Sequence, residues 1–77
     1  MLIDLFVVGA TLYEIVWLGE PVVVPFTVSS YEQTTGGIFV PFKMLGRCTF
    51  NESDVGTILF TNQQDAEIAV KGMIQYD

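Results

Sequence analysis

The side chains that could do chemistry are few, and their types leave little room for an enzyme. The chain has no histidine and a single cysteine, Cys48, so one copy cannot assemble a Ser–His or Cys–His nucleophile or a zinc site of the usual ligands. Asp65 and Glu67 stand two residues apart near an expected helix start, where they suit the helix dipole better than acid–base catalysis. We therefore expect no catalytic residues and no cofactor.

Residues 51–54, Asn-Glu-Ser-Asp, are the nearest approach to a metal-binding loop. They lack the ligand spacing of a dedicated calcium loop, and side chains of these types are common in turns. We expect a polar turn here, with one turn of 3₁₀ helix, and no metal site.

Lys43 and Arg47 are the only basic residues close to each other in the sequence. Cations of this kind bind phosphate, so several copies of the chain could form a pocket for a small nucleotide-like ligand. The hydroxyls of Thr34 and Thr35 and the ring of Tyr31 would complete that pocket. In a single copy, the two cations more simply solvate a strand and its turn, so the pocket is an alternative prediction.

Acidic residues dominate the charge of the chain. Nine Asp and Glu oppose three Lys and Arg, which gives a net charge of −6. This balance weighs against direct binding to nucleic acid, because phosphate affinity comes from Lys and Arg, and it suits docking onto a basic protein surface. The acidic positions predicted to contact such a partner are Glu20, Glu32, Glu52 and Asp54.

The apolar content exceeds what so short a chain can bury. The 77 residues form one domain, 1–77, in which 51% of residues are hydrophobic and 16% are charged, against about 25% charged in an average domain. A chain of this length buries only about 60–65% of its unfolded surface, so we expect a homo-oligomer. The predicted interface residues are Phe39, Leu45 and Ile68, which point away from the expected core.

The first 18 residues are apolar enough to raise the question of a signal peptide or a membrane span. Asp4 and Glu14 interrupt the run, no basic segment precedes it, and a span needs about 20 apolar residues. We therefore expect no membrane segment. The single Cys48 excludes an internal disulfide and suits a reducing cytoplasm.

Runs of β-branched and aromatic residues, punctuated by Gly and Pro, predict short strands. Residues 22–30 alternate, which should place the even-numbered side chains from Val22 to Val28 in the core. Residues 31–37 should form a hairpin connection. The expected strands are residues 2–8, 11–18, 22–30, 38–45 and 57–60, with residues 47–50 as a further short one.

Residues 56–74 turn a strand directly into the only convincing helix. Thr61 is the predicted N-cap, and Gln64 follows it at the spacing of a capping box. The expected helix spans residues 62–75, and its apolar side chains recur with the period of one helical face. These side chains are Ala66, Ala69, Val70, Met73 and Ile74.

Together the elements predict an α+β fold. The expected architecture is a small, antiparallel, SH3-like and partly open β-barrel of five to six short strands, closed by one C-terminal helix. A curled antiparallel sheet packed on one helix is the alternative. No repeat, linker or second domain is visible in the sequence.

Two motifs lie in the last third of the chain, residues 54–61 (Asp-Val-Gly-Thr-Ile-Leu-Phe-Thr) and residues 65–70 (Asp-Ala-Glu-Ile-Ala-Val). Together they resemble the C-terminal signature of small proteins from gut bacterial phages and prophages, which read Gly-Lys-Thr-Val-Phe-Leu-Thr, then Glu-Glu-Ala-Glu and an Ala-Leu pair. The Lys of that signature is missing here, and the likeness is concentrated in the C-terminal part of the chain. The resemblance implies a phage setting and a strand-to-helix ending, and it supplies no catalytic residue.

Three functions fit these observations. The first is a small non-enzymatic phage protein, a counter-defence inhibitor that occupies a basic surface of a host protein. The alternative is an oligomeric sponge that sequesters a nucleotide-like immune signal, and a structural phage accessory protein is the third. Each would place the chain in the cytoplasm of an infected bacterium.

Overall fold

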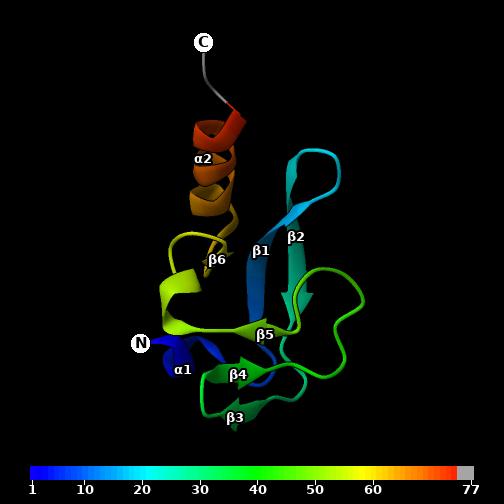
Figure 1. Cartoon of the computed structure of the whole chain (residues 1–77), viewed down its shortest axis with the longest axis vertical. Helices are drawn as coiled ribbons and strands as arrows, with labels where there is room; N and C mark the ends of the chain where they lie inside the picture. The colour runs from blue at the N-terminus through cyan, green and yellow to red at the C-terminus, as the bar shows by residue number, and fades with distance from the viewer. Residues whose placement is uncertain (75–77) are drawn as a thin grey trace.

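The computed structural model describes residues 1–74 of the chain. Its elements form two antiparallel sheets of three strands, with strand orders β2-β1-β6 and β3-β4-β5. The molecule measures 40 × 21 × 20 Å, with α2 beside the β1–β2 hairpin at one end and α1 with the β3–β4 hairpin at the other (Figure 1). In chain order the elements are α1 (Leu2–Leu5), β1 (Thr11–Trp17), β2 (Pro21–Thr27), β3 (Glu32–Thr34), β4 (Gly37–Phe39), β5 (Thr49–Phe50), the 3₁₀ turn η1 (Glu52–Asp54), β6 (Leu59–Phe60) and α2 (Gln63–Ile74).

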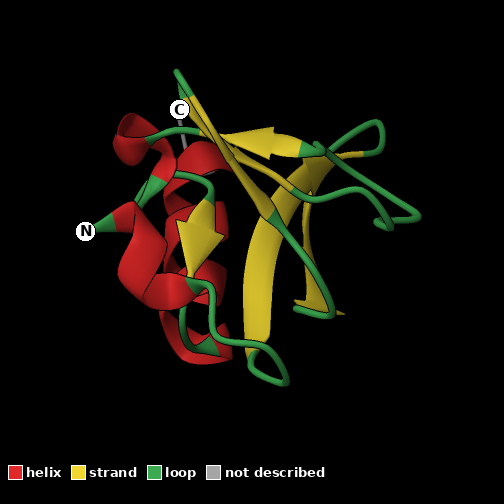
Figure 2. Cartoon of the chain, turned by 90° about the horizontal axis from the view of Figure 1, so that it is seen from below, coloured by secondary structure: helices red, strands yellow, loops and turns green. Residues whose placement is uncertain are grey.

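The first sheet is built on the long β1–β2 hairpin. Its two strands pair over seven positions, and because successive side chains alternate between the faces of a strand, Leu12 and Glu14 face one side and Ile15 the other. Leu12 belongs to the main core, whereas Ile15 is buried outside that cluster. α2 packs against all three strands of this sheet, and the helical segments gather on one side of the strands in Figure 2. The first sheet therefore contacts both α2 and the main core.

The main core lies where the first sheet meets α1 and the second sheet. Aromatic rings run through it: Phe6 lies 5.7 Å from Tyr31 and 6.1 Å from Phe50 between ring centroids. Phe50 in turn stacks on Phe26 at 6.0 Å, with 5° between the ring planes. Separations of this size are those at which aromatic pairs attract beyond simple burial. The buried members of the core are Leu2, Phe6, Leu12, Val28, Ile38, Val40, Phe50 and Leu59.

The prediction of a strand over residues 2–8 is wrong, because the chain forms α1 there instead. Leu2 and Phe6 are both buried. Their spacing of four residues puts them on the same face of a helix and also on the same face of a strand, so burial does not distinguish the two. The deciding contact is tertiary: the Leu2 backbone N–H donates to both carboxylate oxygens of Glu52 at 3.0 Å. This bond satisfies a helix-start N–H that the helix itself cannot satisfy.

The strand predicted over residues 38–45 is wrong beyond Phe39, where β4 ends. Pro41 has no N–H to continue the ladder, and the chain leaves the sheet as a loop until β5. The predicted connection 31–37 is also too long, because it contains β3 and leaves only Thr35 and Gly36 as the turn. Likewise, only Thr49–Phe50 of the predicted strand 47–50 pairs.

Other predicted elements are confirmed. β1 ends one residue before its expected bound, and β2 begins one residue early and ends three residues early. The polar turn predicted at residues 51–54 contains η1. The α+β class is confirmed, with two antiparallel sheets and a C-terminal helix. Over the described residues the two sheets do not close into a barrel.

α2 begins one residue later than expected, and Thr61 is not its cap. Asn62 Oδ1 accepts the Asp65 backbone N–H at 2.8 Å, and Asn62 Nδ2 lies 3.2 Å from Asp65 Oδ2. Of the predicted apolar face, Ala66 is fully buried and Ile74 is 49% exposed, while the other three members are half-buried. The last predicted helical residue, Gln75, lies outside the described residues.

The cap assignment predicts a stability difference between two neighbouring substitutions. Asn62→Ala should lower the free energy of unfolding by about 1 kcal/mol, because it removes the acceptor for a helix-start N–H. Thr61→Ala is the matched control, since Thr61 is exposed, and it should change stability by less than about 0.5 kcal/mol. Urea melts of both variants measure the difference, and an equal loss in the two would contradict the assignment.

Candidate functional site

Glu14 is a carboxylate inside the protein, on the face of β1 that looks toward the core. Its side chain is 1% exposed. A charge withdrawn from water is costly unless it is paired and fully hydrogen-bonded. The partners of Glu14 all come from residues 41–47, a segment distant in sequence that we call the anchored loop.

Lys43 brings the opposite charge to Glu14. Its Nζ donates to Glu14 Oε1 at 2.5 Å and to the Leu45 carbonyl oxygen at 2.5 Å, and its side chain is only 2% exposed. Nζ also lies 4.5 Å from the centroid of the Phe26 ring, within the range of a cation–π contact. Two of the three N–H donors of the ammonium group therefore bond to groups within the protein, and the charge also lies over an aromatic ring.

The backbone of the anchored loop completes the site. The Arg47 N–H donates to Glu14 Oε2 at 2.8 Å. At Gly46, φ is +87° and a Cβ would lie 2.6 Å from Glu14 Oε1, so glycine is required both for the turn and for the close approach. One buried carboxylate thus holds the anchored loop by a side chain and by its main chain.

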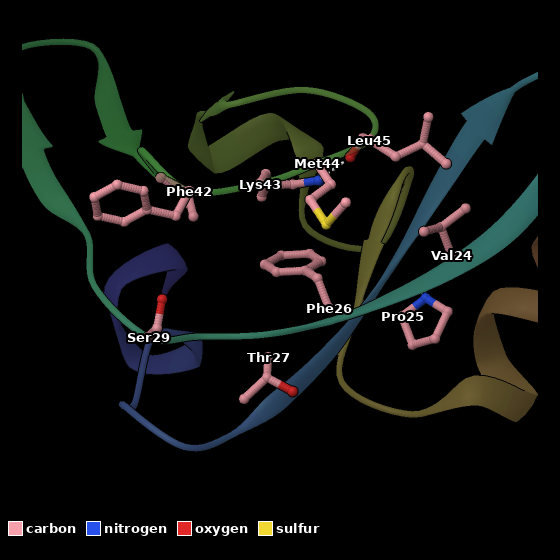
Figure 3. A pocket seen from close by; sticks show the side chains of 10 residues that line it. Val24, Pro25, Phe26, Thr27, Ser29, Phe42, Lys43, Met44 and Leu45 are labelled. Atoms are coloured by element: carbon pink, nitrogen blue, oxygen red, sulfur yellow. Dashed lines mark hydrogen bonds between the residues drawn. The ribbon is translucent and has the colours of Figure 1, made fainter.

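While Lys43 points inward, its neighbours point out. Phe42, Met44 and Leu45 are 78%, 100% and 43% exposed. They border a hollow of about 270 Å³ between the anchored loop and β2, which we call the β2 groove. Figure 3 shows Phe42 and Leu45 at opposite ends of the groove, with Met44 and Phe26 near its middle. The ion pair therefore presents three apolar side chains to solvent in a defined position.

A second ion pair ties the end of the anchored loop to η1. Arg47 Nη1 lies 3.1 Å from Asp54 Oδ1, and Asp54 Oδ2 accepts the Asn51 backbone N–H at 2.9 Å. The Asp54 side chain is 10% exposed and that of Arg47 is 52% exposed. Asp54 is therefore a structural carboxylate with its partners inside the chain.

The four acidic residues predicted to contact a partner are not brought together. Glu20 lies in the β1–β2 turn, at the α2 end of the molecule, whereas Glu32 is on β3 at the opposite end (Figure 1). Glu52 lies at the same end as Glu32, since its carboxylate holds α1 and α1 contacts β4, the partner of β3. Asp54 is buried in its pair with Arg47. Glu32 and Glu52 are therefore the two residues of the four that are exposed and lie away from the α2 end.

The residues of the alternative ligand pocket are dispersed as well. Lys43 is buried against Glu14, and Arg47 is paired with Asp54. Thr34 and Thr35 are exposed at the tip of the β3–β4 hairpin, and Tyr31 packs against Phe6. No pair of unengaged cations faces these hydroxyls within residues 1–74.

The predicted oligomer residues occupy three separate environments. Phe39 is half-buried on β4, opposite Glu32 and Thr49 in the sheet. Leu45 is exposed on the anchored loop and Ile68 is 61% exposed on α2. Leu45 alone of the three borders the β2 groove.

Sequence reasoning missed Glu14, Phe42 and Met44 as the main features of this site. A signal was present: Glu14 is the one charged residue of a strand whose neighbours on both faces are apolar, so its carboxylate lies among apolar side chains whichever face it takes. In a chain with three cations, that placement calls for a buried Lys or Arg.

Within the part of the chain that the structure describes, no cluster of three or more acidic or cysteine side chains could hold a metal ion. No helix among residues 1–74 is long and apolar enough to cross a membrane. Comparison with known proteins finds no matching family model, no matching curated protein and no matching solved structure.

The ion pair predicts a large effect when only one partner is removed. Lys43→Met should lower the free energy of unfolding by about 3–5 kcal/mol, because the Glu14 carboxylate is left buried without its counter-charge. Adding Glu14→Gln to that variant should recover part of the loss, since an amide oxygen still accepts the Arg47 N–H.

The matched control for this test is Lys71→Met, which makes the same change at an exposed position of α2. It should alter stability by less than about 0.5 kcal/mol. Chemical denaturation of the three variants provides the measurement. Equal stabilities of Lys43→Met and Lys71→Met would contradict the role assigned to the buried pair.

Proposed function

We propose that the protein is a small, non-enzymatic binding protein that docks onto a basic surface of a host protein. The phage resemblance of residues 54–61 and 65–70 makes a bacterial defence protein the proposed target, and inhibition by occupation of its basic site the proposed mechanism. Such a protein would act in the cytoplasm of an infected bacterium. We further propose that the two sheets correspond to an opened SH3-like barrel, which the short strands and the 3₁₀ turn before β6 support.

The observation that carries the proposal is that two of the three cations already pair with carboxylates of the same chain. Two of the three basic side chains, Lys43 and Arg47, are paired with Glu14 and Asp54. Seven other Asp and Glu residues remain, and Lys71 is the one basic side chain left to balance them. One of the seven, Asp77, lies outside the described residues. The outer surface is therefore more one-sidedly acidic than the composition alone requires, and a field of this sign speeds encounters with a basic partner.

Glu32 and Glu52 form the proposed contact, which we call the acidic end. Both residues are exposed; Glu32 lies on β3 at one end of the molecule (Figure 1), and Glu52 lies beside α1, where both its carboxylate oxygens accept the Leu2 backbone N–H. Asp4 on α1 adds a third carboxylate there, 72% exposed, although the Met1 ammonium lies 3.3 Å from its Oδ2. The nucleotide-sponge alternative loses its main support, because Lys43 is occupied by Glu14.

The acidic end predicts a charge effect that depends on position. An exposed ion pair contributes about 0.2–1 kcal/mol, so Glu32→Gln should weaken binding of the partner by up to about fivefold, mainly through a slower on-rate. Glu20→Gln is the matched control, because it makes the same change at the opposite end of the molecule and should leave the affinity unchanged.

The measurement is surface-based kinetics on the partner captured from a bacterial lysate by immobilised wild-type protein. The on-rate should fall as salt rises, because exposed charges are screened beyond the Debye length. An on-rate that does not change with salt, or equal effects of Glu32→Gln and Glu20→Gln, would remove the basis for docking through the acidic end.

A further inference from the structure

The β2 groove differs in charge from the rest of the surface. None of the described residues that line it is acidic, and its lining is mainly apolar. The single cation at the groove, Lys43, is neutralised from inside by Glu14. A protein with a net charge of −6 thus has a groove whose lining, among the described residues, holds no carboxylate. We call this lining the groove face; it carries Phe42, 78% exposed, and Met44, 100% exposed.

This face is also preorganised for binding. The anchored loop is held to Glu14 by Lys43 and by the Arg47 N–H, and Gly46 fits against the same carboxylate. Because the loop is already ordered, less conformational entropy is lost when its side chains are covered. Exposed apolar groups on an ordered loop are typical of an interface.

The groove is large enough for an aromatic ring. Its volume is about 270 Å³, whereas a cavity of about 150 Å³ holds benzene. Phe42 stands at one end of the groove and is 78% exposed. One copy of the chain therefore carries both a projecting ring and a hollow that fits one.

We propose that this face binds a second copy of the chain, in a two-fold dimer in which Phe42 of each copy enters the β2 groove of the other. In a two-fold interface both subunits contribute the same patch. The patch must therefore carry both the inserted ring and the groove that receives it, and here Phe42 and the β2 groove do so. Two copies of an acidic protein repel each other, and the repulsion is least when the two groove faces meet.

A basic partner is a poorer occupant of this face, because the groove lining offers it no carboxylate. A stable interface covers about 800 Å² on each subunit, roughly one-sixth of the 4916 Å² that a single chain exposes. The dimer is independent of the proposed docking through the acidic end, since Glu32 and Glu52 are absent from the groove lining.

Sedimentation equilibrium of the full chain tests the proposal. The wild type should form a dimer of 8.6 kDa subunits, and Phe42→Glu should raise the dissociation constant by at least about thirtyfold, the effect of losing a central contact. Ile68→Glu is the matched control, because Ile68 is an exposed apolar residue on α2 outside the groove, and it should leave the dimer intact.

Met44→Glu is a second test at the same face, at a position that is fully exposed and so places no demand on folding. It should also dissociate the dimer, with circular dichroism confirming that each variant is folded. A monomeric wild type, a dimer that survives both groove substitutions, or equal dissociation by Ile68→Glu would overturn the proposal. Glu32→Gln should stay dimeric, so failure of the docking proposal is measured separately.

Discussion

The buried pair between Glu14 and Lys43 is the interaction on which most of this structure depends. It places two opposite charges in the core at 2.5 Å, each almost fully removed from water. Such an arrangement is tolerated only when the remaining hydrogen-bonding capacity is also satisfied, and the Arg47 N–H and the Leu45 carbonyl oxygen do this. The requirement ties a seven-residue loop to the centre of β1 and sets which of its side chains face out.

This pair also determines how charge is distributed over the surface. A chain with three cations that pairs Lys43 and Arg47 with its own carboxylates has little positive charge left to offset its other carboxylates. The same loop borders the groove face, so the surface divides into an acidic end and an apolar groove. Two surfaces of such different chemistry suit different partners, and a small protein can use both at once because they lie on different elements.

The errors made from sequence share one physical cause, which is contact between segments distant in the chain. Residues 2–8 have the composition of a strand, but the bond from the Leu2 N–H to Glu52, fifty positions away, favours a helical turn. From sequence, Lys43 is predicted to be a solvated residue of a strand, whereas in the structure it is buried against Glu14. At the start of α2, Thr61 and Asn62 are both good caps, and the choice between them rests on the path of the chain out of β6.

The sequence by itself determined the local features: β1 through its β-forming residue types, β2 through its alternation, the 3₁₀ turn through its Asn-Glu-Ser-Asp residues, the C-terminal helix through its period, and the acidic net charge. These follow from interactions within a few residues. The tertiary structure alone decided which charges are buried, where the apolar excess is exposed, and which acidic residues are neighbours. Burial and pairing depend on side chains that meet only when the sheets assemble, and for Glu14 and Lys43 those side chains are 29 residues apart.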